Sequence, residues 1–235
     1  MMIAKPLKKG VDWTFGALLR AFMRNCFVHP LIRLNYRVTV EGEEELRFAH
    51  EGAIVVANHI SRVDGPFIVS MLWRHVRIRP TAWHAEYTHP AQWPVMKLFG
   101  AVCLGSPKHL PEEERLRRKT ESKRIMKKIL DAGHPLLIFA EGGIGDGTRV
   151  SVPPHYSGVH DMIAAHRDKP VIFVRLSGLE YSAFGKRSGH TGSFRRLPVT
   201  MTLTRTGHLS LEGGPQGLNA RIERFFNDGV PLATE

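Results

Sequence analysis

Residues 53–66 read AIVVANHISRVDGP, an apolar run that stops abruptly at Asn58 and His59. A run of this length predicts a strand buried on both faces, as in a parallel sheet. A second run of this kind, HPLLIFAEGG at residues 134–143, also ends in polar and glycine residues. In open α/β sheets, sites form beyond the carboxyl ends of the strands. The two stretches therefore predict both the type of sheet and the place of a functional site.

The rest of the chain alternates between strand and helix patterns. Strands are predicted at residues 36–42, 52–58, 78–87, 101–106, 134–143, 169–178, 198–205 and 208–214. Helices are predicted at residues 11–35, 65–76, 90–100, 111–132, 155–166 and 219–229. Such alternation predicts a single α/β domain with a mostly parallel central sheet flanked by helices.

The composition fits a chain with a packed core that interacts with anions. The 235 residues are 43% hydrophobic and carry a formal net charge of +11. That charge suits nucleic acid, an anionic membrane face or acidic substrates. The basic residues are spread along the chain and are not interleaved with stacking aromatics, so an anionic membrane surface is the expected partner and nucleic acid is not. The two cysteines, Cys26 and Cys103, fit a reducing compartment.

The N-terminal segment, residues 1–35, has an amphipathic pattern of aromatic and aliphatic residues with interspersed arginines. Such a helix can lie in a membrane interface or pack on the domain as an ordinary first helix. We expect residues 1–35 to associate with the membrane and residues 36–235 to form the catalytic domain. The predicted location is peripheral, on the cytoplasmic face of the cell (inner) membrane.

His59 and Asp64 are five residues apart at the predicted end of a strand. A neutral imidazole can remove a proton from an alcohol, and a carboxylate on its other nitrogen fixes the tautomer. The pair therefore suits activation of a substrate hydroxyl. The alternative is structural: His59 caps the following turn and Asp64 is the N-cap of the next helix.

Glu141 stands just past the second strand, before glycines that let backbone N–H groups approach an anion. NHISRVDG followed by FAEGG resembles the glycerolipid (lysophospholipid) acyltransferase family, whose signatures are N-H-x-x-x-x-D and F-P-E-G-T-R. The resemblance extends over residues 35–205 and includes LFGAVCLGS and KPVIFVRLSG. Within the family, the chain is most similar to the acyltransferase portion of bacterial 2-acylglycerophosphoethanolamine acyltransferases.

The resemblance implies acyl transfer to a hydroxyl of a lysophospholipid or glycerophospholipid. His59 would be the general base, and Asp64 would orient it and balance its charge. The donor would be acyl-CoA or acyl-carrier protein, and no metal or organic cofactor is expected. The implied substrate-binding residues are Glu141, Gly142, Gly143, Arg62, Lys108 and Arg149.

Two arginines of the family pattern are missing. Gly143 and Ile144 occupy the positions of T-R in E-G-T-R, and Ser106 stands where an upstream block often ends in arginine. Guanidinium groups suit bidentate phosphate contacts, so their loss argues against lysophosphatidic acid as the acceptor. Arg149, Lys108 and Arg62 are the possible substitutes, with a solvated loop residue as the alternative for Arg62.

Two alternatives to an active acyltransferase remain at this stage. A lipid-binding member with altered catalysis would explain the changed Glu-Gly-Gly loop. A metal-dependent hydrolase could use His155, His160, Asp161 and His166 with His59 and Asp64, although helical spacing makes these poor co-ligands. Separately, the basic residues between Arg115 and Lys128 fit either docking of an acidic carrier protein or a solvated helix face.

Overall fold

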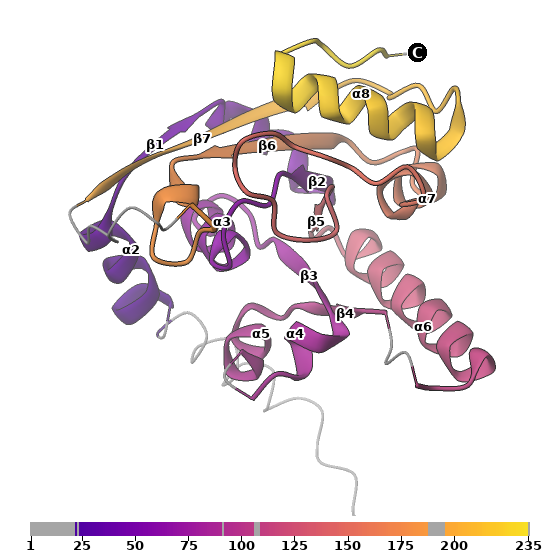
Figure 1. The fold of residues 1–235 in the computed structure, drawn as a ribbon, viewed down its shortest axis with the longest axis horizontal. Coiled ribbons are helices and arrows are strands. Elements are labelled where there is room, and N and C mark those ends of the chain that lie inside the picture. The colour runs from indigo at the N-terminus through magenta and orange to yellow at the C-terminus, as the bar shows by residue number, and fades with distance from the viewer. Residues whose placement is uncertain (1–21, 23, 91, 106–108, 188–195, 235) are drawn as a thin grey trace, which may run out of the picture.

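The computed structural model describes residues 22, 24–90, 92–105, 109–187 and 196–234. Within these residues, seven strands form one sheet in the order β1-β7-β6-β2-β5-β3-β4 (Figure 1). The strands are β1 Tyr36–Glu41, β2 Ile54–Ala57, β3 Arg79–Trp83, β4 Val102–Leu104, β5 Leu136–Phe139, β6 Val171–Ser177 and β7 Leu197–Thr206. Neighbouring strands are parallel except β6 and β7, so the predicted mostly parallel sheet is confirmed.

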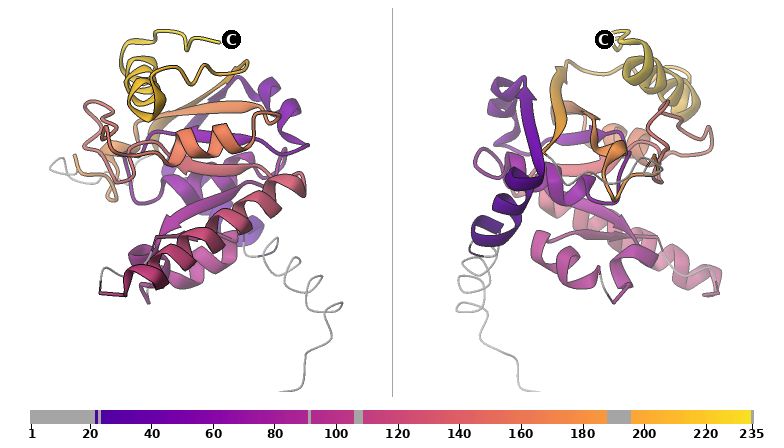
Figure 2. Two further views of the ribbon diagram at one scale, coloured as in Figure 1. Left: turned by 90° about the vertical axis from the view of Figure 1, so that its right-hand side faces the viewer. Right: turned by 60° about the vertical axis from the view of Figure 1, so that its left-hand side comes forward.

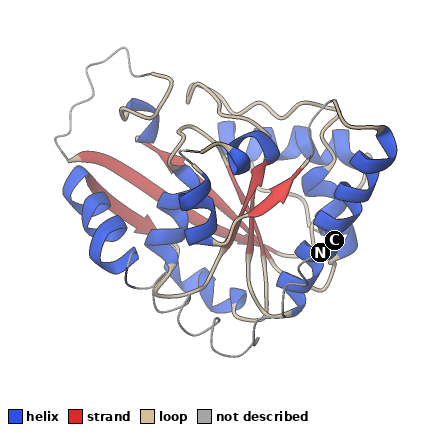
Figure 3. Ribbon diagram, turned by 90° about the horizontal axis from the view of Figure 1, so that it is seen from below, coloured by secondary structure: helices blue, strands red, loops and turns tan. Residues whose placement is uncertain are grey.

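Helices cover both faces of the sheet (Figure 3). They are α2 His29–Asn35, α3 Asp64–Leu72, α4 His84–Thr88, α5 Trp93–Phe99, α6 Glu112–Asp131, α7 Gly158–Ala165 and α8 Gly214–Asp228. Short helical turns occur at Arg24–Val28, Glu43–Ala49 and Leu179–Tyr181. None of the helices in the described ranges is long and apolar enough to cross a membrane.

The central strand β2 shows why the sequence folds as a three-layer α/β domain. All four of its residues are buried. Val55 and Ala57 pack in a core with α2, α3 and the Glu43–Ala49 turn, whereas Ile54 and Val56 pack with α6, α7 and α8 on the other face. A strand that is covered on both sides has no polar face, which accounts for its uninterrupted apolar run.

Two predicted strands differ from the structure. In the segment 78–87 only Arg79–Trp83 is a strand, and the chain turns directly into α4. The strand predicted at 208–214 is wrong: β7 ends at Thr206, and beyond it Leu209 forms only an isolated bridge with Thr234. Gly213 and Gly214 have positive φ angles and begin α8, so the chain leaves the sheet there.

The predicted N-terminal helix lies mostly outside the described residues. Of the segment 1–35, the structure describes Phe22, the turn Arg24–Val28 and α2. In α2, Ile32 is buried in the core, whereas Leu31 and Leu34 are exposed. Val28 also packs against this core, and Phe22 is exposed as well, so the described part has two apolar contacts with the domain and three large apolar side chains in solvent. Membrane association of this segment stays a prediction.

Candidate active site

The imidazole of His59 and the carboxylate of Asp64 meet directly after β2. The distance from His59 Nδ1 to Asp64 Oδ2 is 2.9 Å. The Asp64 side chain is completely buried, and the His59 side chain is 19% exposed. A hydrogen bond at Nδ1 leaves Nε2 as the ring nitrogen available to a substrate. The arrangement has the geometry of a general base oriented by a carboxylate.

Asp64 also holds the loop that carries His59. Its Oδ2 accepts backbone hydrogen bonds from Ile60 N, at 2.6 Å, and Ser61 N, at 2.8 Å. Asp64 is itself the first residue of α3, and its carboxylate points back along the chain. The interpretation of Asp64 as an N-cap is therefore wrong, because the groups that it binds precede the helix.

Glu141, two residues after the end of the neighbouring strand β5, supports His59. His59 N donates to Glu141 Oε2 at 2.6 Å, and Gly145 N donates to His59 O at 2.6 Å. These contacts follow from the pairing of β2 with β5, in which Ala57 lies opposite Phe139. The Glu141 side chain is buried and lies behind the main chain of His59. The loops after the two strands are therefore joined at His59.

Burial raises the pKa of both carboxyl groups of this site. Burial raises the pKa of Asp64, and the hydrogen bonds from His59, Ser61 and Ile60 oppose the rise. Burial likewise raises the pKa of Glu141 to about 7, against the opposing hydrogen bond from His59 N. The charge of the Glu141 carboxyl group therefore changes near neutral pH.

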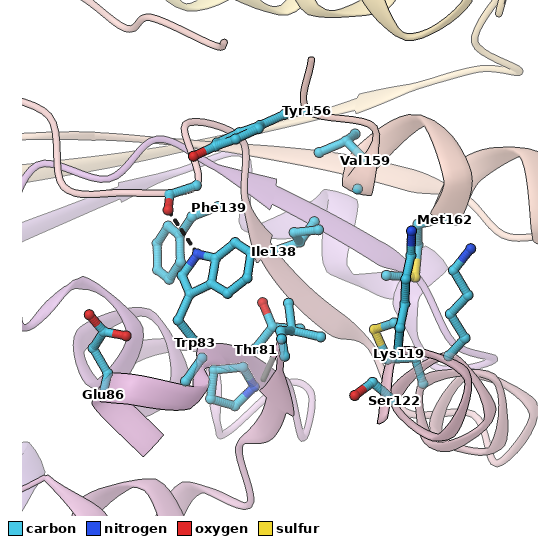
Figure 4. A pocket seen from close by; sticks show the side chains of 18 of the residues that line it. Thr81, Trp83, Glu86, Lys119, Ser122, Ile138, Phe139, Tyr156, Val159 and Met162 are labelled. Atoms are coloured by element: carbon cyan, nitrogen blue, oxygen red, sulfur yellow. Dashed lines mark hydrogen bonds between the residues drawn. The ribbon is translucent and has the colours of Figure 1, made fainter. Parts of the chain in front are cut away.

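Two aromatic residues complete the surroundings of His59, and neither was predicted from the sequence to have a role. The Phe139 ring stacks on the imidazole with centroids 4.1 Å apart. Trp83, at the end of β3, donates from Nε1 to Gly142 O at 2.8 Å (Figure 4). Trp83 thereby fixes the glycine loop while half of its side chain stays exposed. Phe139 could have been noticed because it lies two residues before Glu141, but no local signal marks Trp83.

Asn58 is a third residue whose role appears only in the fold. Its side-chain amide donates to Leu176 O at 2.9 Å, and its Oδ1 accepts from Leu176 N at 2.7 Å. The amide thus extends the pairing of β2 with β6 by one position beyond the strand. Asn58 is buried and anchors the loop just before His59.

The two glycines after Glu141 have different surroundings. Gly142 has a φ of 64°, and a Cβ there would lie 2.2 Å from the ring of Tyr156. Gly143 is exposed, and a Cβ there would have nothing within 4 Å. The backbone therefore requires glycine at 142, whereas position 143 has room for a larger side chain.

A cavity of about 1560 Å³ lies beside His59. Its volume exceeds the usual range for small-molecule pockets, so it can accept a large ligand. Its apolar wall comes from strands and helices on several sides: Pro80, Phe99, Leu104, Met126, Ile138 and Met162. Figure 4 shows Trp83 and Glu86 on one side of this space and Lys119 with Ser122 on the other. An apolar cavity next to an imidazole–carboxylate pair can hold an aliphatic chain close to a general base.

The predicted substrate-binding residues do not all reach this cavity. Arg62 is exposed and lines it, together with Gly142 and Gly143. Arg149 is not among the lining residues, and its Nη2 lies 3.8 Å from Asp228 Oδ2 at the end of α8. Lys108 falls outside the described residues, as does Ser106.

The histidines of the α7 region are dispersed. The His155 ring makes an edge contact with Tyr156, and His160 Nδ1 lies 3.6 Å from Asp161 Oδ1. His166 is buried beyond the end of α7, and burial lowers its pKa. Within the ranges that the structure describes, no three His, Cys, Asp or Glu residues are grouped as metal ligands.

The comparison with protein families places the chain in a class. A family model described as Acyltransferase matches residues 37–177, which is more than half of the chain. The chain therefore belongs to this family and is an acyltransferase, and the predicted membership of the glycerolipid acyltransferases is confirmed. The matched range contains His59, Asp64 and Glu141.

A solved structure has a similar fold. It is the 1-acyl-sn-glycerophosphate (LPA) acyltransferase, PlsC, from Thermotoga maritima. The TM-score is 0.55 at 18% sequence identity, and the match covers 92% of this chain and 86% of the other. At this identity the likeness concerns the fold, and it agrees with the predicted single α/β domain.

Proposed function

We propose that this acyltransferase moves a fatty acyl group from an acyl thioester to a hydroxyl of a lysophospholipid or glycerophospholipid acceptor. The observation that carries the proposal is the His59–Asp64 pair, 2.9 Å apart, in the wall of a large apolar cavity. A lipid is the class of substrate that needs both an aliphatic cavity and a base for its hydroxyl. The name of the PlsC relative, which refers to such a lipid, supports the same class.

The proposed chemistry needs only proton transfer and one nucleophilic substitution. His59 Nε2 removes the proton of the acceptor hydroxyl, and the hydroxyl oxygen attacks the thioester carbonyl carbon at the same time. The tetrahedral intermediate collapses, the carbon–sulfur bond breaks, and the imidazolium returns the proton to the leaving thiolate. The products are the ester and the free thiol of CoA or carrier protein. Asp64 stabilises the imidazolium through Nδ1.

Glu141 has a supporting role in this proposal. Its carboxyl group accepts the His59 backbone N–H, lies behind the main chain and is buried. It therefore positions the catalytic histidine. The substrate faces Arg62, Gly142 and Gly143, which line the cavity.

The acceptor is expected to differ from lysophosphatidic acid. Ile144 lines the cavity where the family pattern has an arginine, and Arg149 lies at α8. An acceptor whose phosphate carries a substituent needs fewer cationic contacts than a phosphomonoester. We further propose that the enzyme acts peripherally at the cytoplasmic face of the membrane, held by residues 1–35 and by its positive charge.

Release of free thiol tests this function. Acyl-CoA and acyl-carrier protein are each offered with a panel of lysophospholipids, for wild type and His59→Ala. Acceptor-dependent thiol release in wild type that disappears in His59→Ala supports the proposal. A folded wild-type protein that binds the acceptors but releases no thiol would favour a lipid-binding member of the family instead.

A further inference from the structure

The inward face of α6 changes character along its length. In its C-terminal half, Met126, Ile129 and Leu130 pack into the core of the sheet face. The same stripe continues from Met126 toward the N-terminus through residues 122, 119 and 115, because side chains three and four positions apart share a face. Ser122 ties the helix to β4 by donating to Cys103 O at 2.9 Å. Beyond Ser122 the stripe carries Arg115 and Lys119 in place of apolar residues.

These two residues, called here the cationic pair, face the cavity. Both Arg115 and Lys119 line it and are exposed. Lys123 and Lys127 continue the row at four-residue spacing, but they are paired with Asp161, at 3.4 Å, and Asp131, at 2.7 Å. Among the described residues, the side chains of the cationic pair have no hydrogen-bond or ion-pair partner, although Arg115 N donates to Pro111 O within the helix. Two positive charges at inward positions without acidic partners are suited to an anionic ligand.

Acidic residues of the same helix do not neutralise the pair. Glu114 is held by Arg117 and Arg118, with the closest distances at 2.7 and 3.0 Å. Glu121 is paired with Arg124. Glu112 also lines the cavity, in the first turn of α6. The cavity wall at this end of α6 therefore has a surplus of positive charge.

The cationic pair lies at a distance from His59. α6 packs on the edge strand β4, and β5 and β3 separate β4 from β2. Three strand spacings correspond to roughly 14 Å. α6 leads into β5 at its C-terminal end, so its N-terminal end is directed toward the catalytic edge of the sheet, where it extends beyond the strands (Figure 2). One cavity thus has the general base on one side and the cationic pair on the other.

We propose that Arg115 and Lys119 bind the phosphate of the phosphopantetheine arm of the acyl thioester donor. The proposal rests on the proposed thioester-dependent function. In a glycerophospholipid acceptor the phosphate is close to the reacting hydroxyl, so that anion must stay near His59. In the donor, a long flexible arm separates the thioester from its phosphate and can span the cavity. The cationic pair therefore fits the donor better than the acceptor.

A membrane surface explains the pair less well. Cations that bind a lipid surface project outward from the protein, as Arg117 and Lys128 do on the opposite side of α6. Arg115 and Lys119 instead line the cavity that contains His59. CoA and carrier protein share the phosphopantetheine group, so the chemistry is common to both donors and the test separates them.

The test compares two double variants of the same net charge. Arg115→Gln/Lys119→Gln removes the pair, and Arg117→Gln/Lys128→Gln removes two cations from the opposite side. Each protein is assayed with acyl-CoA, acyl-carrier protein and an acyl-N-acetylcysteamine thioester, which lacks phosphate. We expect the first variant to raise KM about tenfold or more for the phosphorylated donors, with kcat and the KM of the phosphate-free donor unchanged. The ratio of the CoA and carrier-protein effects identifies the physiological form.

Several outcomes would overturn the proposal. One is a change in KM that is equal in the two double variants. Another is a rise in the KM of Arg115→Gln/Lys119→Gln for the phosphate-free donor that equals its rise for the phosphorylated donors. Loss of binding to phosphatidylglycerol vesicles without a change in donor KM would assign the pair to the membrane. If wild type transfers acyl groups from no donor, the proposed function fails. Equilibrium binding of CoA to wild type and both double variants then tests separately whether the cationic pair binds the donor phosphate. Equal affinities of the three proteins would exclude that role.

Discussion

The loops that follow β2 and β5 lie side by side, yet they differ in how firmly they are held. In the loop after β2, Asn58, Ser61 and Asp64 are buried and hydrogen bonded. In the loop after β5, Glu141 is buried, but Gly143 and Arg149 are exposed. The first loop matches the family pattern through Asp64, whereas the second departs from it at Ala140, Gly143 and Ile144. Ala140 is buried and its N–H donates to Ala57 O, so a departure also occurs at a restrained position.

This difference separates the two tasks of the site. The first loop presents a base, which needs a fixed tautomer and position. The second loop contributes one buried acceptor for that base and then lines the cavity, where its residues can vary with the acceptor. Four tests, described from the largest expected effect to the smallest, examine this division.

His59→Ala should have the largest effect, on the first loop. The substitution removes the proposed general base and leaves the hydrogen bonds from Ile60 and Ser61 to Asp64 in place. We expect thiol release to fall by at least about 10³-fold. Thermal unfolding serves as the control and should show a folded variant. Activity within tenfold of wild type would exclude His59 as the base.

Glu141→Gln should change how stability depends on pH. The folded-state pKa of Glu141 is raised from 4.5 to about 7. As pH rises through this interval, the unfolded chain loses its proton first, so the folded wild type loses stability relative to it. Gln keeps an acceptor for His59 N and cannot ionise. Between about pH 5 and pH 8, the unfolding free energy of the variant should rise relative to wild type by about 2–3 kcal/mol.

Urea unfolding of the two proteins at several pH values measures this difference. Parallel stability curves for wild type and Glu141→Gln would show that the carboxyl group ionises in the folded state as readily as in the unfolded chain. The link between the two loops at His59 would then be independent of pH.

Adjacent glycines of the second loop should respond differently to alanine. Gly142 has a positive φ, and its Cβ would meet the Tyr156 ring, so Gly142→Ala should lower the free energy of unfolding by about 1–3 kcal/mol. Gly143→Ala, which meets no neighbour, should stay within about 0.5 kcal/mol of wild type. Chemical denaturation measures the free energy of unfolding of both variants. Equal losses of stability would contradict the view that the loop is restrained at Gly142 and unrestrained at Gly143.

Gly143→Thr/Ile144→Arg restores the family pattern after Glu141. Position 143 has room for a side chain, and position 144 lines the cavity. A guanidinium there can form charge-assisted hydrogen bonds with a phosphomonoester, so KM for lysophosphatidic acid should fall roughly tenfold. Gly143→Thr alone is the control and should leave that KM unchanged. An unchanged KM in the double variant would show that these positions do not select the acceptor.

The sequence predicted the local parts of this arrangement. The apolar run before Asn58 predicted the central strand, and the pairing of His59 with Asp64 was one of two interpretations of their five-residue separation, favoured by the family resemblance. The change from strand to glycine-rich loop predicted the place of Glu141. Its contact was not predicted, because it depends on which strand lies beside β2. The strand predicted at 208–214 was wrong because the alternating pattern there contains the two glycines that start α8.

The sequence by itself determined those features that depend on residues only a few positions apart. These include the buried strands, the long helix α6 with acids at its start, and the carboxylate next to the histidine. The tertiary structure alone decided that Glu141 supports His59, that Trp83 fixes Gly142, and that Arg115 and Lys119 face the cavity. Strand order and helix packing bring these residues together across long separations, and a periodic pattern carries no information about either.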